Sequence, residues 1–173
     1  MRRIPVFLLP LLLWGCAGIP KGVEPVKDFE IKRYLGTWYE IARYDHFFER
    51  GLEQVTAHYS MRRDGGVRVV NRGYDPEKGV WKEAVGKAFF VSKPDIGRMK
   101  VSFFGPFYGG YNIIDLDSED YSFALVCGPN RSYLWILSRS PWMEQSTLSR
   151  LKNSARRAGF DTDKLIHVKQ EEY

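Results

Sequence analysis

Few side chains in this chain of 173 residues have the type and spacing that catalysis or metal binding needs. The three histidines, His46, His58 and His167, show no metal-ligand spacing. Cys127 lies in an apolar run with no histidine close in sequence, which favours an inert buried thiol over a nucleophile. The chain has no Gly-x-Ser-x-Gly motif, and the glycine-rich segment 105–110 lacks the Lys-Ser/Thr pair of a phosphate loop. The sequence therefore predicts no catalytic residue, no metal and no cofactor.

Composition narrows the class of protein. With 44% hydrophobic and 15% aromatic residues, the chain is neither disordered, collagen-like nor a multi-span membrane protein. Its length favours one domain. The formal net charge of +5 is too small to indicate nucleic-acid binding.

The first fifteen residues have the layout of a secretory signal peptide. Residues 1–3 (Met-Arg-Arg) precede an apolar stretch, 4–14, which is too short and too broken by Pro5 and Pro10 to span a bilayer of roughly 30 Å. Residues 13–16 (Leu-Trp-Gly-Cys) resemble the bacterial lipoprotein box. The resemblance implies cleavage after residue 15 and acylation of Cys16, for example by palmitate. The alternative is an ordinary signal peptide in which Cys16 is incidental.

The next segment, 16–27, is expected to be a lipidated N-terminus and short tether, because Pro20, Gly22 and Pro25 interrupt it. Ala17 follows the cysteine; an Asp there usually marks inner-membrane retention in bacterial lipoproteins, so the outer membrane, on its periplasmic face, is expected. Removing the signal would lower the formal net charge to +3, which suits a membrane surface. With Cys16 acylated, Cys127 has no disulfide partner in the chain, so the core must stabilise the fold.

From residue 34 onward, runs rich in Val, Ile, Tyr, Phe and Trp recur between turn signals, a pattern typical of an all-β antiparallel barrel or sandwich. The expected strands are 36–44, 54–61, 67–74, 80–91, 99–104, 111–116, 121–127 and 133–138. After the last of these strands, the spacing of the apolar residues changes. Leu148, Leu151 and Ala155 are at helical spacing, which predicts a helix within 144–158 that buries Leu148 and Leu151 outside the sheet. A short strand is expected at 164–169.

Three motifs occur in order along these elements: Gly-x-Trp within residues 33–40, Asp120-Tyr121 before the seventh strand, and Arg139 after the eighth. Together they resemble the motifs of the lipocalin family. Segments 45–51 and 103–110 resemble its bacterial branch, which is related to apolipoprotein D. The resemblance covers about residues 28–169. It implies an eight-stranded antiparallel up-and-down barrel with one C-terminal α-helix packed outside, in a single domain, 28–173.

The resemblance also assigns Gly36, Trp38, Asp120, Tyr121 and Arg139 to the closed end of the barrel as structural residues. Trp38 would plug the barrel from the base of the first strand. Arg139 would pack over it in a cation–π contact worth roughly 0.5–2 kcal/mol.

An eight-stranded barrel has room for its own side chains or for one small ligand. Strand alternation predicts that Glu40, Ala42 and Tyr44 share the inward face of Trp38. Small inward residues leave volume that a packed core would fill, which favours a cavity over the alternative of a filled barrel. The expected ligand-lining residues are Tyr59, Ala57, Ala88, Phe90, Phe103 and Trp135. By resemblance to apolipoprotein-D-like lipocalins, Tyr59 and Trp135 would contact an apolar ligand.

Glu40 is the one inward carboxylate in this scheme, and a buried carboxylate must be paired or hydrogen-bonded. We expect a structural role near the barrel base. A catalytic acid would need a second titratable partner inside, and the sequence identifies none.

The connections 45–53, 74–79, 105–110 and 128–132 are expected to gather at the open mouth. Two of them carry aromatic pairs, Phe47-Phe48 and Phe107-Tyr108. These form either a rim for lipid entry, membrane contact or dimerisation, or side chains folded back over the barrel. Basic side chains in the mouth connections would suit a phosphate, although each alone reads as solvated charge: Arg50, Lys78 and Arg131.

The expected function is that of an outer-membrane lipoprotein that stores or carries fatty acids or lysophospholipids in the bacterial envelope. Its expected partners are one small hydrophobic ligand, the membrane through Cys16, and a second copy in a homodimer, with no nucleic acid. Two alternatives stay open: a lipid-modifying enzyme that uses Cys127 or Glu40, and a structural lipoprotein with a filled barrel.

Overall fold

The computed structural model describes residues 17–171, so Cys16 and the signal segment lie outside the described residues. Within them the strands are β1 (Gly36–Arg43), β2 (Glu53–Met61), β3 (Val67–Asp75), β4 (Val80–Phe90), β5 (Arg98–Ser102), β6 (Gly109–Leu116), β7 (Phe123–Cys127), β8 (Leu134–Ser138) and β9 (Ile166–His167). The helices are α1 (Ile31–Tyr34), α2 (Gln145–Arg157) and a short 3₁₀ turn, Thr162–Lys164.

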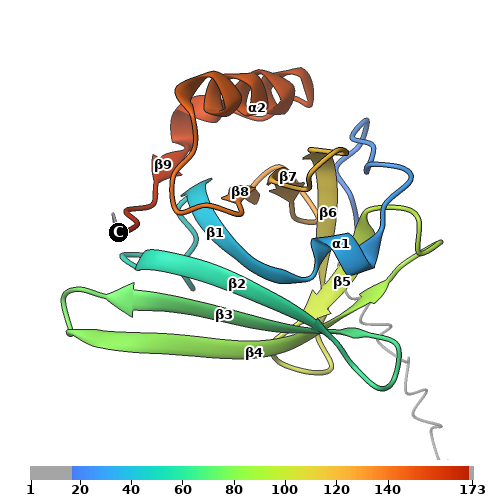
Figure 1. The fold of residues 1–173 in the computed structure, drawn as a ribbon, viewed down its shortest axis with the longest axis horizontal. Coiled ribbons are helices and arrows are strands. Elements are labelled where there is room, and N and C mark those ends of the chain that lie inside the picture. Colours follow the sequence, from blue (N-terminus) through green and yellow to red (C-terminus); the bar gives the residue numbers. More distant parts are fainter. Residues whose placement is uncertain (1–16, 172–173) are drawn as a thin grey trace, which may run out of the picture.

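Strands β1 to β8 form a closed antiparallel up-and-down barrel (Figure 1). Each strand pairs with the next in sequence, and β1 also pairs with β8, which closes the sheet. β9 adds to β1, with Ala42 opposite His167. The expected fold class is confirmed, including a helix, α2, after the eighth strand.

The structure differs from the expected elements mainly at their ends. β5 stops at Ser102, and β7 begins only at Phe123, two residues after Tyr121, whose φ of 55° lies in the left-handed region. The last strand is reduced to Ile166–His167. The sequence did not predict α1, a single turn ahead of β1.

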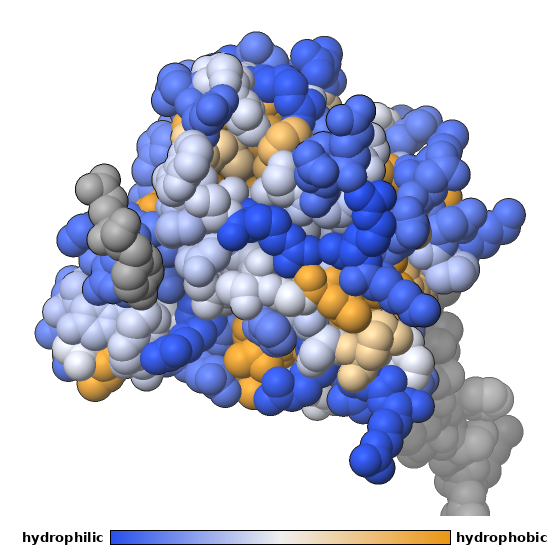
Figure 2. Space-filling model, viewed as in Figure 1, coloured by the Kyte–Doolittle hydropathy of each residue, from blue (hydrophilic) through white to orange (hydrophobic). Residues whose placement is uncertain are grey.

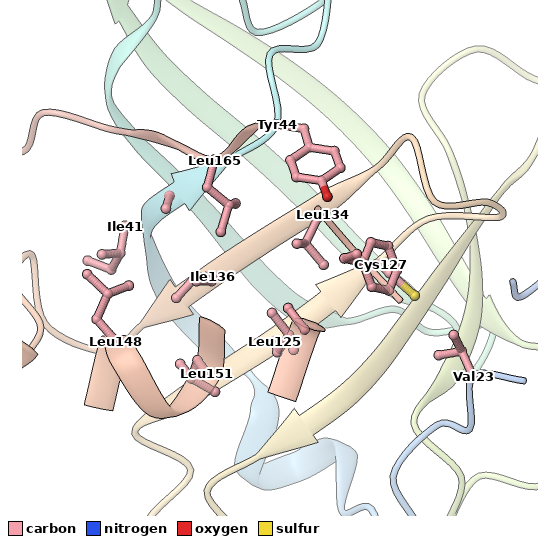
Figure 3. Packing of buried hydrophobic residues seen from close by; sticks show 13 residues of the cluster. Val23, Ile41, Tyr44, Leu125, Cys127, Leu134, Ile136, Leu148, Leu151 and Leu165 are labelled. Atoms are coloured by element: carbon pink, nitrogen blue, oxygen red, sulfur yellow. The ribbon is translucent and has the colours of Figure 1, made fainter. Parts of the chain in front are cut away.

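Two apolar clusters stabilise the barrel, one inside it and one between its wall and α2. Figure 3 shows the outer cluster. The outer cluster buries Leu148 and Leu151 of α2 against Leu125 and Ile136 of the wall, as the helical periodicity predicts. Fully burying a leucine side chain contributes roughly 1.5–3 kcal/mol, so α2 seals one side of the barrel.

A β-bulge in β1 overturns part of the predicted alternation. Glu40 lies opposite Leu137 and Ala42 lies opposite Ile136, so Ile41 is an extra residue in the strand. Beyond the bulge the faces are exchanged. Ala42 and Tyr44, expected inside, belong to the outer cluster, and Arg43 is instead buried beside Glu40.

The wall over β2, β3 and β4 is mainly hydrophilic, with separate apolar patches (Figure 2). Outward side chains such as Arg68, Arg72 and Glu83 are exposed there, while Val67 and Val69 are buried inside. This alternation is what a half-buried antiparallel strand requires.

The N-terminal segment runs along the outside of the barrel. At its start the Gly18 carbonyl accepts a hydrogen bond from Asn112 at 3.1 Å, close to Pro129 of the open-end connection between β7 and β8. Further on, the Val26 backbone bonds to Ile113 and Gly97 toward the closed end. A chain that begins at Ala17 contains all of the strands and both of the clusters described above.

Candidate ligand-binding barrel

The closed end is sealed by Trp38, which is fully buried. Its indole Nε1 donates to the Tyr34 carbonyl at 2.8 Å, so α1 caps the same end. The Arg139 guanidinium lies 4.0 Å from the centroid of the Trp38 ring, the cation–π contact that the resemblance implies. Gly36 has a φ of 96° and leaves room for Arg139.

In the connection before β7, the ordering role falls on a residue that the motif did not indicate. Asp120 is exposed, whereas the Asp117 carboxylate accepts hydrogen bonds from the backbone of Glu119 and from both the backbone and the hydroxyl of Ser122. These bonds hold the pKa of Asp117 below its usual value, although burial opposes them. Tyr121 is buried, and its hydroxyl accepts from the Glu30 backbone N–H at 3.0 Å.

All six residues expected to line a ligand belong to the inner cluster. Tyr59 and Ala88 are buried, whereas the other four are partly exposed: Ala57, Phe90, Phe103 and Trp135. A Cβ added to Gly86 would lie 2.8 Å from the Phe103 ring, so this ring uses the space that the glycine leaves.

A chain of three tyrosine hydroxyls crosses the closed half of the interior. The hydroxyl of Tyr111 lies 2.8 Å from those of Tyr34 and Tyr59. Burial raises the pKa of all three hydroxyls above its usual value, so they are neutral hydrogen-bonding groups. Tyr111 was not among the expected lining residues, although its alternation with Ile113 along β6 could have indicated it.

Toward the mouth the interior carries a polar cluster, which we call the mouth cluster: Glu40, Arg43, His46, Glu49 and Trp135. Arg43 donates to the Glu40 carboxylate at 2.7 Å, in an ion pair buried on both sides. The Trp135 indole donates to the Glu49 carboxylate at 3.1 Å, and the imidazole of His46 packs 4.7 Å from the Trp135 ring. The second titratable partner that Glu40 was expected to lack is therefore present.

Arg43 also fixes the connection between β1 and β2 over the mouth. Its Nη2 donates to the backbone carbonyl of Glu49 at 2.7 Å and to that of Leu52 at 3.3 Å. Sequence reasoning missed Arg43 because the bulge reverses its face, and missed Glu49 because an acidic residue in a connection usually points into water.

Burial governs the protonation of the mouth cluster. Burial and the nearby Glu49 raise the pKa of Glu40 well above its usual value, although Arg43 opposes them. Burial likewise raises the pKa of Glu49. Burial, aided by Arg43, lowers the pKa of His46 to about 4, so the imidazole is neutral at neutral pH.

The open end exposes aromatic side chains. Phe47 and Phe104 are each 81% exposed and Phe107 is 62% exposed, so these rings do not fold back over the barrel. Phe48 is partly exposed and stacks on His46. Among the basic residues expected to suit a phosphate, Arg50 pairs with Asp45, and Arg131 donates to the carbonyls of Ala158 and Lys21.

Two hollows open outside the barrel. One, of about 160 Å³, is lined by Tyr39, Gln54, Thr56, Arg72, Trp81, Pro141, Gln170 and Glu171; the other, of about 400 Å³, by Tyr44, Asp45, Arg131, Ser132 and Lys164. Neither contains an expected lining residue, so the interior cavity stays a prediction.

The thiol of Cys127 is buried in the outer cluster, away from the barrel interior. Burial raises its pKa to about 12, the opposite of what a nucleophile requires. Residues 17–171 contain no group of three or more His, Cys, Asp or Glu side chains arranged to hold a metal. In the same part of the chain, no helix is long and apolar enough to cross a membrane.

Comparison with known proteins places this barrel in a family. A family of lipocalin-like domains matches residues 29–170, the whole of the barrel and its helix. The chain belongs to the lipocalin family. This lipocalin is 56% identical over 171 residues to the "Outer membrane lipoprotein Blc" of Vibrio cholerae, a match that covers 99% of this chain and 100% of that protein.

Other lipocalins are similar in sequence or in fold. The chain is 58% identical to "Outer membrane lipoprotein Blc" of Escherichia coli K12 over 87% of this chain and 85% of that protein. It is 30% identical to mouse apolipoprotein D, over 84% and 80% of the two chains. The structure of insecticyanin from the tobacco hornworm Manduca sexta superposes with a TM-score of 0.69 at 22% identity, covering 90% of this chain and 88% of that one, which shows a shared fold.

Proposed function

We propose that this lipocalin is a lipid-anchored protein of the outer membrane that holds one fatty acid or lysophospholipid in its barrel. The observation that carries the proposal is the inner wall, where Ala57, Gly86 and Ala88 stand beside the aromatic rings of Phe90, Phe103 and Trp135. The names of the "Outer membrane lipoprotein Blc" relatives support the anchor and the compartment. On this proposal residues 1–15 are the signal and Cys16 carries the acyl chains.

An acyl chain suits such a wall because its binding needs burial more than polar contacts. Each buried methylene contributes about 0.8 kcal/mol, so a long chain binds without an extensive polar site. The rings of Tyr34, Trp38 and Tyr59 fill the closed half, with Tyr34 and Trp38 centroids 4.6 Å apart. The methyl end of a bound acyl chain would therefore stop above these rings.

The position of the tether supports lipid entry from a membrane. Gly18 lies beside Pro129 at the open end, so an anchor at Cys16 would hold the mouth near the bilayer. Phe47, Phe104 and Phe107 are exposed at this same end and would enter the interfacial region. The pairing of two such rims in a homodimer is the other use of this surface, and sedimentation of the soluble chain distinguishes the two.

The test is calorimetric titration of the delipidated chain beginning at Ala17 with 1-palmitoyl lysophospholipid below its critical micelle concentration. We expect saturation at one lipid per chain. Trp135→Ala should weaken binding by about tenfold, since the indole contacts the ligand in this proposal. Trp142→Phe is the matched control, because Trp142 is 66% exposed and lies outside the inner cluster. A folded protein that binds neither lysophospholipid nor palmitate would overturn the proposal.

A further inference from the structure

The mouth cluster contains one positive charge fewer than it contains carboxylates. Arg43 is 2% exposed and its ion pair is with Glu40. Glu49 is 7% exposed and forms no ion pair with any residue in 17–171; its carboxylate accepts from the Trp135 indole. A buried carboxyl group without a neighbouring cation either stays protonated or binds a positively charged partner.

The hydrogen-bonding atoms of the cluster that have no partner also indicate that a positively charged donor group is missing. His46 is 4% exposed, and its Nε2 is buried with no partner among the described residues. In the tautomer of the neutral imidazole that carries its proton on Nδ1, this Nε2 is an acceptor. The second oxygens of Glu40 and Glu49 have no described donor either. Against these acceptors stands one unpartnered donor, the buried Nε of Arg43.

We propose that the mouth cluster is a head-group site and that it takes the ammonium group of a zwitterionic single-chain lipid, such as lysophosphatidylethanolamine. The inference rests on the proposed function and names its ligand class. The ammonium supplies three N–H donors and one positive charge to Glu49, His46 Nε2 and Glu40. The adjacent phosphate can accept from Arg43 Nε, which places one opposite charge beside each end of the head group.

A carboxylate head is a poor fit for the same reason. Glu40 and Glu49 would repel it, and Arg43 already donates to Glu40 and to two backbone carbonyls. The cluster therefore selects an amine-bearing lipid over a free fatty acid or a phosphoglycerol lipid of equal chain length.

Binding of an ammonium group should also release a proton. Burial raises the pKa of Glu40 and Glu49, and a cation between them favours their ionised forms. The other charged or titratable groups that face this pair are Arg43 from β1, His46 from the connection and Tyr59 from β2. Burial raises the pKa of Tyr59 further above neutrality, so the released proton comes from the two carboxyls.

The experiment compares lipids with the same palmitoyl chain on the protein beginning at Ala17, by calorimetry near pH 7.5. Lysophosphatidylethanolamine should bind about tenfold more tightly than lysophosphatidylglycerol and palmitate. Glu49→Gln should remove that preference, because the amide oxygen can still accept from Trp135 while the negative charge that attracts the ammonium group is lost. Glu77→Gln, which neutralises an exposed carboxylate at the same end, is the matched control.

Proton release gives a second readout that does not depend on a variant. In buffers of different ionisation enthalpy, lysophosphatidylethanolamine should release protons and lysophosphatidylglycerol should not. Equal affinities for the two lipids in the natural chain, or equal weakening of both by Glu49→Gln, would overturn the head-group assignment. If neither lysophospholipid nor palmitate binds, the proposed function fails; if the two lysophospholipids bind alike, only the head-group site fails.

Discussion

The guanidinium of Arg139 spans the closed end of the barrel and lies over Trp38, 4.0 Å from the ring centroid. Its nitrogens donate to three backbone carbonyls, those of Arg33 at 2.7 Å, Thr37 at 3.0 Å and Tyr121 at 3.3 Å. One side chain thereby connects α1, the first strand and the turn before the seventh. This arrangement makes Arg139 a structural residue of the seal.

Replacing Arg139 should destabilise the fold without changing the interior. We expect Arg139→Met to lower the free energy of unfolding by about 2–4 kcal/mol, because it loses the cation–π contact and leaves carbonyls without donors. Arg139→Lys keeps the charge but cannot reach all three carbonyls, so it should lose about 1–3 kcal/mol. Urea unfolding measures both.

The control for Arg139 is Arg150, which also lies over an aromatic ring, that of Phe123, at 4.7 Å. Its ion pair with Asp115 is partly exposed, so Arg150→Met should cost under about 1 kcal/mol. Equal losses at the two arginines would show that the carbonyl bonds of Arg139 contribute little.

The buried pair of Arg43 and Glu40 should respond differently to single and double substitution. Arg43→Met alone should cost about 3–5 kcal/mol, because it leaves Glu40 without a cation and frees the Glu49 and Leu52 carbonyls. Adding Glu40→Leu should restore part of that stability, since an apolar pair needs no compensating charge. A double variant less stable than Arg43→Met, measured in urea, would contradict a pairing role.

Much of this barrel follows from the sequence, and the exceptions have identifiable causes. Leu148, Leu151 and Ala155 predict α2 because their 3.6-residue spacing is independent of the rest of the fold. The bulge at Ile41 was not predicted, because strict alternation allows no extra residue in a strand, and beyond Ile41 the faces exchange. Because of this one inserted residue, the alternation did not predict that Arg43 points inward, and the mouth cluster was therefore missed. Asp117 was missed because several acidic residues share its turn, and only the backbone geometry selects one.

The raised pKa values in the mouth cluster predict a pH dependence of stability with a definite sign. The usual carboxyl pKa is near 4.5, and burial raises that of Glu49 in the folded state. Between the two pKa values the folded state binds more protons, so this group lowers the free energy of unfolding as the pH rises. Glu49→Gln should therefore gain stability relative to the natural chain as the pH rises above about 4.5.

Urea unfolding at several pH values in this range measures that difference. His46 acts with the opposite sign, because its pKa is lowered to about 4 and its contribution is lost as the pH falls below about 6.5. It is present in both proteins and cancels in the comparison. A stability difference that stays constant with pH would mean that Glu49 has an ordinary pKa in the folded chain.

The thiol of Cys127 should be unreactive in the folded protein. It is fully buried in the outer cluster, and burial raises its pKa to about 12, so very little thiolate exists near pH 8. In the chain beginning at Ala17, a thiol reagent should therefore react at the rate of unfolding. Ser149→Cys, on the exposed side of α2, provides the control: one thiol should react at once and the second slowly. Fast reaction of Cys127 in the natural chain would contradict its burial and reopen nucleophilic chemistry at this residue.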